Sequence, residues 1–290
     1  MKFRAVEIQH SWYERLPMRC LFALALARLI PNSLAGYTIT NPNGLARFLD
    51  LTFLLNPAIF AVSRNIFLAA LVLYALRLGW WLVLPFLTLF TVLVGTIINS
   101  QGAIGHYSQI VSLVLCAQTA AYFSGWRKDR ASAENRVIFW SQQAIAATYL
   151  VSALTKLLRT SGTWILQSPK VAVQIIKTTE QDFYDRLDSA SRDQGAAIAD
   201  WMVHHPLLVA LILGAGFFLE LTTPLALLGR IYGLAYGLAL IAFHEGIQRV
   251  MKLGFPFNEY LVAIYFVNAP FWIGLGARKL FARAPSPTSR

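Results

Sequence analysis

The sequence predicts an all-α protein: a polytopic membrane helix bundle of about eight transmembrane helices with an extracytoplasmic amphipathic helical cap. Three observations predict this class. Hydrophobic residues make up 57% of the 290 residues and charged residues 13%, which is about half of the charged share in soluble chains. The mean hydropathy is +0.53. Several apolar runs reach or approach the roughly 18–20 residues that cross a hydrocarbon core, which excludes a soluble domain.

The basic charge balance indicates contact with membrane lipid and gives no support for a nucleic-acid partner. The net charge is +11, and Lys and Arg collect in cytoplasmic loops, where anionic lipids attract them. Cys20 and Cys116 both lie in apolar runs and form neither a CxxC motif nor a metal-binding spacing. We therefore expect both cysteines to pack as small residues.

The N-terminal region is expected to enter the membrane once. Residues 1–15 are polar and basic, which favours a cytoplasmic lead. A first span is expected over residues 16–37, where Arg28 and Pro31 interrupt the apolar run. Because no apolar core with a cleavage site precedes this span, we expect the span to serve as the insertion signal itself.

The next apolar stretch, residues 48–62, is short and interrupted by Asn56 and Pro57. A re-entrant or interfacial segment suits it better than a full span, which is the alternative. A strongly basic loop is expected at residues 125–136. Four spans are expected around that loop, at residues 61–78, 81–98, 106–123 and 137–158.

The polar residues 159–205 interrupt the hydrophobic pattern and can form amphipathic helices. Their apolar content is too small for a separate core, so we expect a cap within one transmembrane domain, residues 16–276. Three further spans are expected, at residues 206–228, 231–250 and 258–276. Residues 277–290 are expected to form a basic cytoplasmic tail.

The loop charges predict the orientation, because short cytoplasmic loops carry an excess of Lys and Arg. With eight spans and the N-terminus inside, Arg77, the 125–136 loop, Arg230 and the tail all lie in the cytoplasm. Arg249 and Lys252 are the exceptions among the short loops. We therefore expect a multi-pass protein of the cell (inner) membrane with both termini cytoplasmic and the cap outside.

Lys156 is the most informative ionisable residue, because it lies near the outer end of its expected span. An ammonium in hydrocarbon costs roughly 2.5–3.5 kcal/mol on insertion scales. Its side chain can extend along apolar surface to the interface, or it can face a polar interior and act as a general base. Helical spacing places Ser152 and Tyr149 on the same face.

Two histidines are expected at the same outer level as Lys156. His106 opens its span after a Gly-rich loop, and an interfacial histidine bonded to a loop carbonyl is the simpler interpretation. His244 lies within its span beside Glu245. Three helices thus present ionisable groups beneath the cap, which favours a polar interior there.

Glu220 is the carboxylate that lies deepest in its expected span. Such a group normally pairs with a cation of another helix. An ion pair with Lys156, Arg28 or His244 is as consistent with the sequence as a chemical role. The histidines show no HxxxH or HExxH spacing, so no metal site is predicted.

Three segments of the chain resemble the HTTM (horizontally transferred transmembrane) domain family, which forms the membrane part of vitamin K-dependent gamma-glutamyl carboxylases. The segments are NSQGAIGHYSQIVSLVL, TYLVSALTKLLRTSGTW and FHEGIQRVMKLGFPFNEYLVAIYF, in the same order as in the family. The resemblance extends from about residue 61 to the C-terminus. It differs at Gly105-His106, where the family has an Asn-His pair.

The resemblance implies a role for each matching residue. Lys156 would correspond to the lysine that deprotonates reduced vitamin K, whose oxygenation then generates a strong base, and His106 to a histidine that assists it. The cofactor would be a reduced quinone of the vitamin K type. Its binding residues would be His244, Tyr149, Trp164 and Glu220.

Two functions remain open. The first is a quinol-dependent enzyme of the carboxylase/epoxidase type; carboxylation by this chain alone is not expected, because no large peptide-binding region follows its last span. The second is a non-enzymatic membrane scaffold that assists maturation or export of a secreted peptide or a separate extracytoplasmic partner. A transporter is less favoured, since no pair of spans shows the Gly/Pro breaks of a repeat-built carrier.

Overall fold

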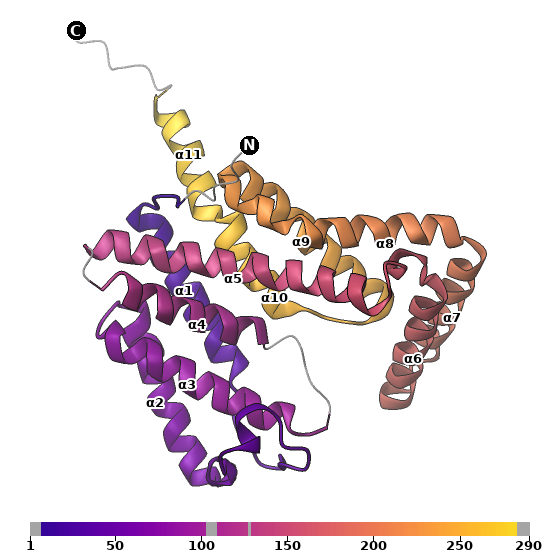
Figure 1. Ribbon diagram of the computed structural model, residues 1–290, viewed down its shortest axis with the longest axis horizontal. Helices are drawn as coiled ribbons and strands as arrows, with labels where there is room; N and C mark the ends of the chain where they lie inside the picture. Colours follow the sequence, from indigo (N-terminus) through magenta and orange to yellow (C-terminus); the bar gives the residue numbers. More distant parts are fainter. Residues whose placement is uncertain (1–6, 103–108, 127–128, 283–290) are drawn as a thin grey trace. The chain divides into compact units, whose positions relative to one another are not determined.

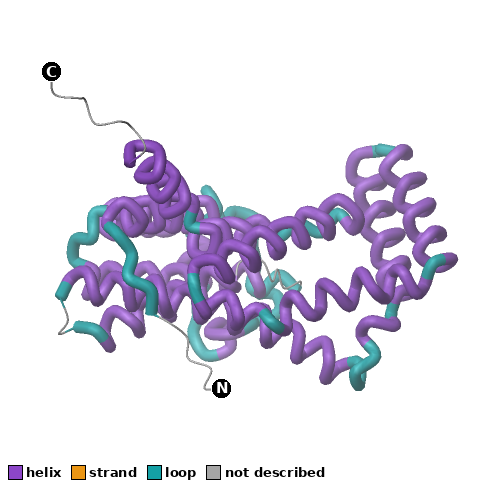
Figure 2. Tube along the Cα trace, turned by 90° about the horizontal axis from the view of Figure 1, so that it is seen from above, coloured by secondary structure: helices purple, strands orange, loops and turns teal. Residues whose placement is uncertain are grey.

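The computed structural model describes residues 7–102, 109–126 and 129–282. These residues form helices and loops without any strand, so the all-α prediction is confirmed (Figure 2). The chain divides into two compact units. We call the described residues of 7–144 and 263–282 the N-terminal unit, and Ile145–Val262 the central unit.

The N-terminal unit contains α1 (Trp12–Leu29), α2 (Pro57–Ala75), α3 (Trp80–Asn99), α4 (Gln109–Ser124), the first half of α5 (Arg130–Arg159) and α11 (Ala269–Ala282) (Figure 1). Side-chain caps set several of these helix starts. The Asn56 side chain accepts hydrogen bonds from the backbone N–H groups of Ala58 and Ile59 at the start of α2. At the start of α5, Asp129 accepts from those of Ala131 and Ser132, which satisfies donors that a helix terminus leaves free.

A buried polar network lies between the helices of the N-terminal unit. The Gln118 side chain is fully buried. It accepts a hydrogen bond from the Tyr74 hydroxyl (2.9 Å) and donates to the hydroxyls of Ser141 (3.1 Å) and Tyr265 (2.8 Å). Tyr74 also stacks on Trp80, with 5.4 Å between ring centroids. These bonds satisfy the amide in an otherwise apolar core.

The central unit contains the second half of α5, α6 (Ser168–Arg186), α7 (Ser189–His204), α8 (Pro206–Leu221), α9 (Arg230–Met251) and α10 (Pro256–Val262). Helices α6 and α7 are the predicted amphipathic pair of residues 159–205, and they lie side by side (Figure 1). Gly195 of α7 makes this approach possible, because a Cβ atom there would overlap the side chain of Thr179 in α6.

Fewer helices than predicted meet the requirements of a membrane span. Among the described residues, four segments are long and apolar enough: Pro57–Ala75, Trp80–Asn99, Arg130–Arg159 and Pro256–Lys279. A fifth arises if α7 and α8, which are bent by 100°, count as one span. The structure thus has the spans of a multi-pass membrane protein, but the prediction of about eight is not confirmed.

The missing spans have physical causes. Helix α1 ends at Leu29, short of the predicted residue 37, and carries four charged residues, among them Arg28. Helix α4 has 16 described residues and α8 has 16, while polar side chains such as Glu245 lower the hydropathy of α9. Residues 48–62 form no span; they contain a 3-10 turn, Thr52–Leu55, and the start of α2.

Two smaller predictions are wrong. Cys20 and Cys116 are free and exposed on the surfaces of α1 and α4, so neither packs as a small interior residue. The basic segment 125–136 is not a loop throughout, because α5 already begins at Arg130. The early start turns Glu134 into the protein interior, where it is 3% exposed.

Candidate functional site

The centre of the candidate site is an ion pair between two helices of the central unit. The Lys156 ammonium, near the end of α5, donates to the Glu220 carboxylate near the end of α8. The Ser152 hydroxyl, one helical turn before Lys156, lies 3.5 Å from the same carboxylate. The Glu220 side chain is 8% exposed and that of Lys156 is 25% exposed. Of the three cations considered for Glu220, the structure therefore selects Lys156.

Aromatic rings surround the charged pair. The Lys156 ammonium lies 5.4 Å from the centroid of the Trp164 ring, at cation–π distance. The His244 ring of α9 stacks with two others, with centroids 5.7 Å from Tyr149 and 5.2 Å from Phe255. Tyr149 is 3% exposed and His244 is 4% exposed. The site therefore combines flat aromatic faces with one pair of opposite charges.

At this site the Tyr149 hydroxyl and Nδ1 of His244 are buried polar atoms without a hydrogen-bond partner in the described residues. The Asn258 side chain interacts with the Tyr149 phenol, but no hydrogen bond of normal geometry forms there. Buried polar groups of this kind are uncommon, because leaving one unpaired costs about 1–3 kcal/mol. Such atoms often mark the position of a ligand.

Close packing of α8 on α9 positions the site. A Cβ atom at Gly216 would overlap the ring of Phe243, so glycine allows the two helices to approach there. Glu220 follows Gly216 by one helical turn, and His244 directly follows Phe243. The contact that brings the helices together thus also sets where the carboxylate and the imidazole lie.

The structure brings five of the six predicted site residues into one unit. Lys156 contacts Glu220 and Trp164, and Tyr149 contacts His244. His106 lies outside the described residues, as do residues 103–105 before it. Among the described residues no group of three His, Cys, Asp or Glu could hold a metal ion.

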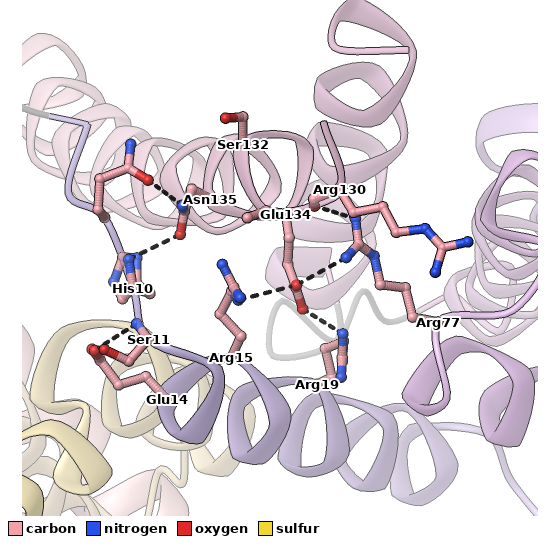
Figure 3. A network of polar contacts seen from close by, with 12 residues as sticks. His10, Ser11, Glu14, Arg15, Arg19, Arg77, Arg130, Ser132, Glu134 and Asn135 are labelled. Carbon is pink, nitrogen blue, oxygen red and sulfur yellow. Dashed lines mark hydrogen bonds and ion pairs between the residues drawn. The ribbon is translucent and has the colours of Figure 1, made fainter. Parts of the chain in front are cut away.

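A second polar cluster, in the N-terminal unit, was not predicted. Glu134 lies 3.2 Å from Nε of Arg15, 2.5 Å from Nη1 of Arg19 and 3.4 Å from Nη1 of Arg77 (Figure 3). Arg77 also donates to the backbone carbonyl of Arg130. The usable signal in the sequence is Glu134 itself, a carboxylate within the basic segment that is predicted to be a loop.

Fold and site together define a class: an all-α protein with several helices able to cross a membrane and a buried polar site between α5, α8 and α9. Comparison with protein-family models, with curated proteins and with solved structures found no match for this chain. The function therefore has to be inferred from the residues themselves.

Proposed function

We propose that this chain is a multi-pass membrane protein that binds the headgroup of a quinone-like lipid against Lys156, Glu220, Tyr149 and His244. The observation that carries this proposal is the pair of unpartnered buried atoms, the Tyr149 hydroxyl and His244 Nδ1, between aromatic faces. A quinone or quinol ring is flat and carries two oxygens, so it can stack on such faces and bond to such atoms.

The ion pair suits deprotonation of a quinol hydroxyl. The two side chains share one titratable proton, which lies on Lys156 or on Glu220. In either case the pair can accept a second proton. The positive charge that results would stabilise the quinol oxygen anion in a site of low dielectric constant. This extends the expected role of Lys156 as a base to the Lys156–Glu220 pair. A reduced quinone would supply the redox chemistry, as in the HTTM-containing carboxylases that the sequence resembles.

The test is oxygen uptake by the purified protein supplied with a reduced vitamin K-type quinone. We expect Lys156→Ala to abolish quinol-dependent uptake while the protein stays folded by circular dichroism. The matched control is Lys170→Ala, which removes an exposed lysine at the start of α6. Uptake that is absent from the wild type, or unchanged in Lys156→Ala, would refute the proposal.

One observation favours the alternative, a scaffold for a secreted peptide or partner protein. Helices α6 and α7 and their connection expose apolar side chains: Val173 is 65% exposed, Tyr184 75% and Leu187 77%. Monomeric proteins rarely leave such surfaces uncovered. The scaffold hypothesis expects a partner to co-purify with the protein, to be lost when residues 170–205 are replaced by a linker, and to be retained in Lys156→Met.

A further inference from the structure

The arginines around Glu134 carry more positive charge than their protein partners neutralise. Arg15 and Arg19 come from α1, Arg77 follows α2, and Arg130 begins α5, so segments distant in the sequence meet here (Figure 3). Arg15, Arg19 and Arg77 contact the carboxylate of Glu134. Arg130 contributes its backbone carbonyl, which accepts a hydrogen bond from Arg77, and its own exposed guanidinium lies beside them. Arg19, Arg130 and Arg15 all act electrostatically on Arg77.

Two further carboxylates of this unit, Glu14 and Asp129, belong to the same region, so three carboxylates stand against four arginines. Glu14 accepts hydrogen bonds from the backbone of Ser11 and from Asn268. Asp129 caps the start of α5, where hydrogen bonds from Ser132 lower the pKa of its carboxyl group. The cluster therefore holds an excess of positive charge among the described residues of this unit.

The arginines are held in place and largely withdrawn from water. The side chains of Arg15, Arg19 and Arg77 are 17%, 16% and 20% exposed. Nε of Arg19 is buried without a hydrogen bond, while Nε of Arg15 has the ion-pair contact with Glu134. Burial is the main cause that lowers the pKa of Arg77, and Glu134 opposes it. Guanidinium groups buried together with a surplus of charge require a counter-ion.

The aromatic side chains around this cluster are of the kinds found at the level of lipid headgroups. The Arg77 guanidinium lies 5.5 Å from the centroid of the Trp80 ring, and Trp80 contacts Tyr122 edge-on. Trp81 directly follows Trp80, and Trp126 lies four residues after Tyr122. Trp81 and Trp126 are 55% and 54% exposed. Trp and Tyr concentrate at the membrane–water interface, where the phosphates of lipids lie.

We propose that Arg15, Arg19, Arg77 and Arg130 form a phosphate-binding site that takes the headgroup phosphate of an anionic membrane lipid. The planar guanidinium group presents paired N–H donors that match phosphate oxygens. Glu134 orients the arginines and leaves their surplus charge for the ligand. The site is independent of the Lys156 site, because no residue is shared.

The test measures binding to the full chain in detergent, by native mass spectrometry, of three probes: short-chain phosphatidylglycerol, short-chain phosphatidylcholine and inorganic phosphate. We expect phosphatidylglycerol to bind more tightly than phosphatidylcholine. Binding of inorganic phosphate in competition with phosphatidylglycerol would support the same site with a soluble phosphate as its source. No preference for phosphatidylglycerol and no phosphate binding would overturn the proposal.

Three variants separate an anion site from a purely structural ion-pair cluster. Arg130→Gln removes one charge without removing a partner of Glu134, and we expect about fivefold weaker phosphatidylglycerol binding. Arg47→Gln, at an exposed arginine of the same unit, is the matched control and should bind as the wild type does. Glu134→Gln removes the competing negative charge and should tighten binding. Unchanged affinity in Arg130→Gln would overturn the proposal, whether or not Glu134→Gln folds.

Discussion

The two polar clusters of this protein each contain one buried glutamate, but they differ in their balance of charge. Glu220 faces one lysine, so the pair is neutral, and its site also contains the Ser152 hydroxyl, a phenol and an imidazole. Glu134 faces three arginines and stays outnumbered. Both glutamates are buried, so burial does not distinguish the two sites. The number of charged partners does: the neutral Lys156–Glu220 pair suits a neutral aromatic headgroup, and the surplus of arginines around Glu134 suits an anion.

The largest expected effect is the loss of Glu134. Glu134→Ala leaves several buried guanidinium groups without a carboxylate, and we expect it to destabilise the protein by about 3–5 kcal/mol. Thermal unfolding in detergent measures the change. Glu245→Ala, which removes only an exposed partner of Arg249, should change stability by less than about 1 kcal/mol. Equal effects for the two variants would contradict the distinction between interior and surface carboxylates.

Loss of Glu220 is expected to cost less. Glu220→Leu leaves Lys156 unpaired, but the lysine side chain is already 25% exposed and can turn toward the interface. We expect a loss of about 1–3 kcal/mol. The double variant with Lys156→Met should recover most of that loss, because the pair is replaced by apolar groups. A double variant as unstable as the sum of the single variants would show that the pair is not the relevant interaction.

Helix packing provides a comparison within the central unit. Gly216→Ala places a Cβ atom against the Phe243 ring, and overpacking of this kind costs about 1–3 kcal/mol. Gly246, also in a helix, has no atom within 4 Å of an added Cβ, so Gly246→Ala should be neutral or slightly stabilising. Both variants are compared by thermal unfolding. Gly216→Ala should also weaken quinone binding if the α8–α9 contact positions the site.

The smallest expected effect concerns the start of α5, the helix that both units share. Hydrogen bonds from Ser132 lower the folded-state pKa of Asp129 below its ordinary value of 3.8. Its contribution to stability is therefore present above the unfolded-state pKa and is lost as the pH falls through the folded-state pKa. Asp129→Asn should remove this acid-side dependence while keeping the cap. The measurement is the free energy of unfolding of the wild type and of Asp129→Asn between about pH 2 and 6.

Much of the fold could be predicted because hydropathy and helix caps are local properties. The apolar runs around Phe67 and Leu87 predicted α2 and α3, and the polar stretch 159–205 predicted a pair of amphipathic helices. Boundaries were less predictable. The basic residues before Val137 indicated a loop, yet Asp129 caps a helix that already begins at Arg130.

The sequence alone determined the all-α class and the apolar helices able to cross a membrane, because composition and periodicity encode these. Lys156, Glu220 and His244 were candidates as ionisable residues within apolar runs, and Tyr149 through its helical spacing from Lys156. Trp164 and the cofactor-binding roles followed from the resemblance to the HTTM family. Only the tertiary structure decided which charges pair. Glu220 joins Lys156 across 64 positions of sequence, and Glu134 joins Arg19 across 115. Such pairs depend on how helices approach one another, at contacts such as Gly216 with Phe243, and no local pattern records that approach.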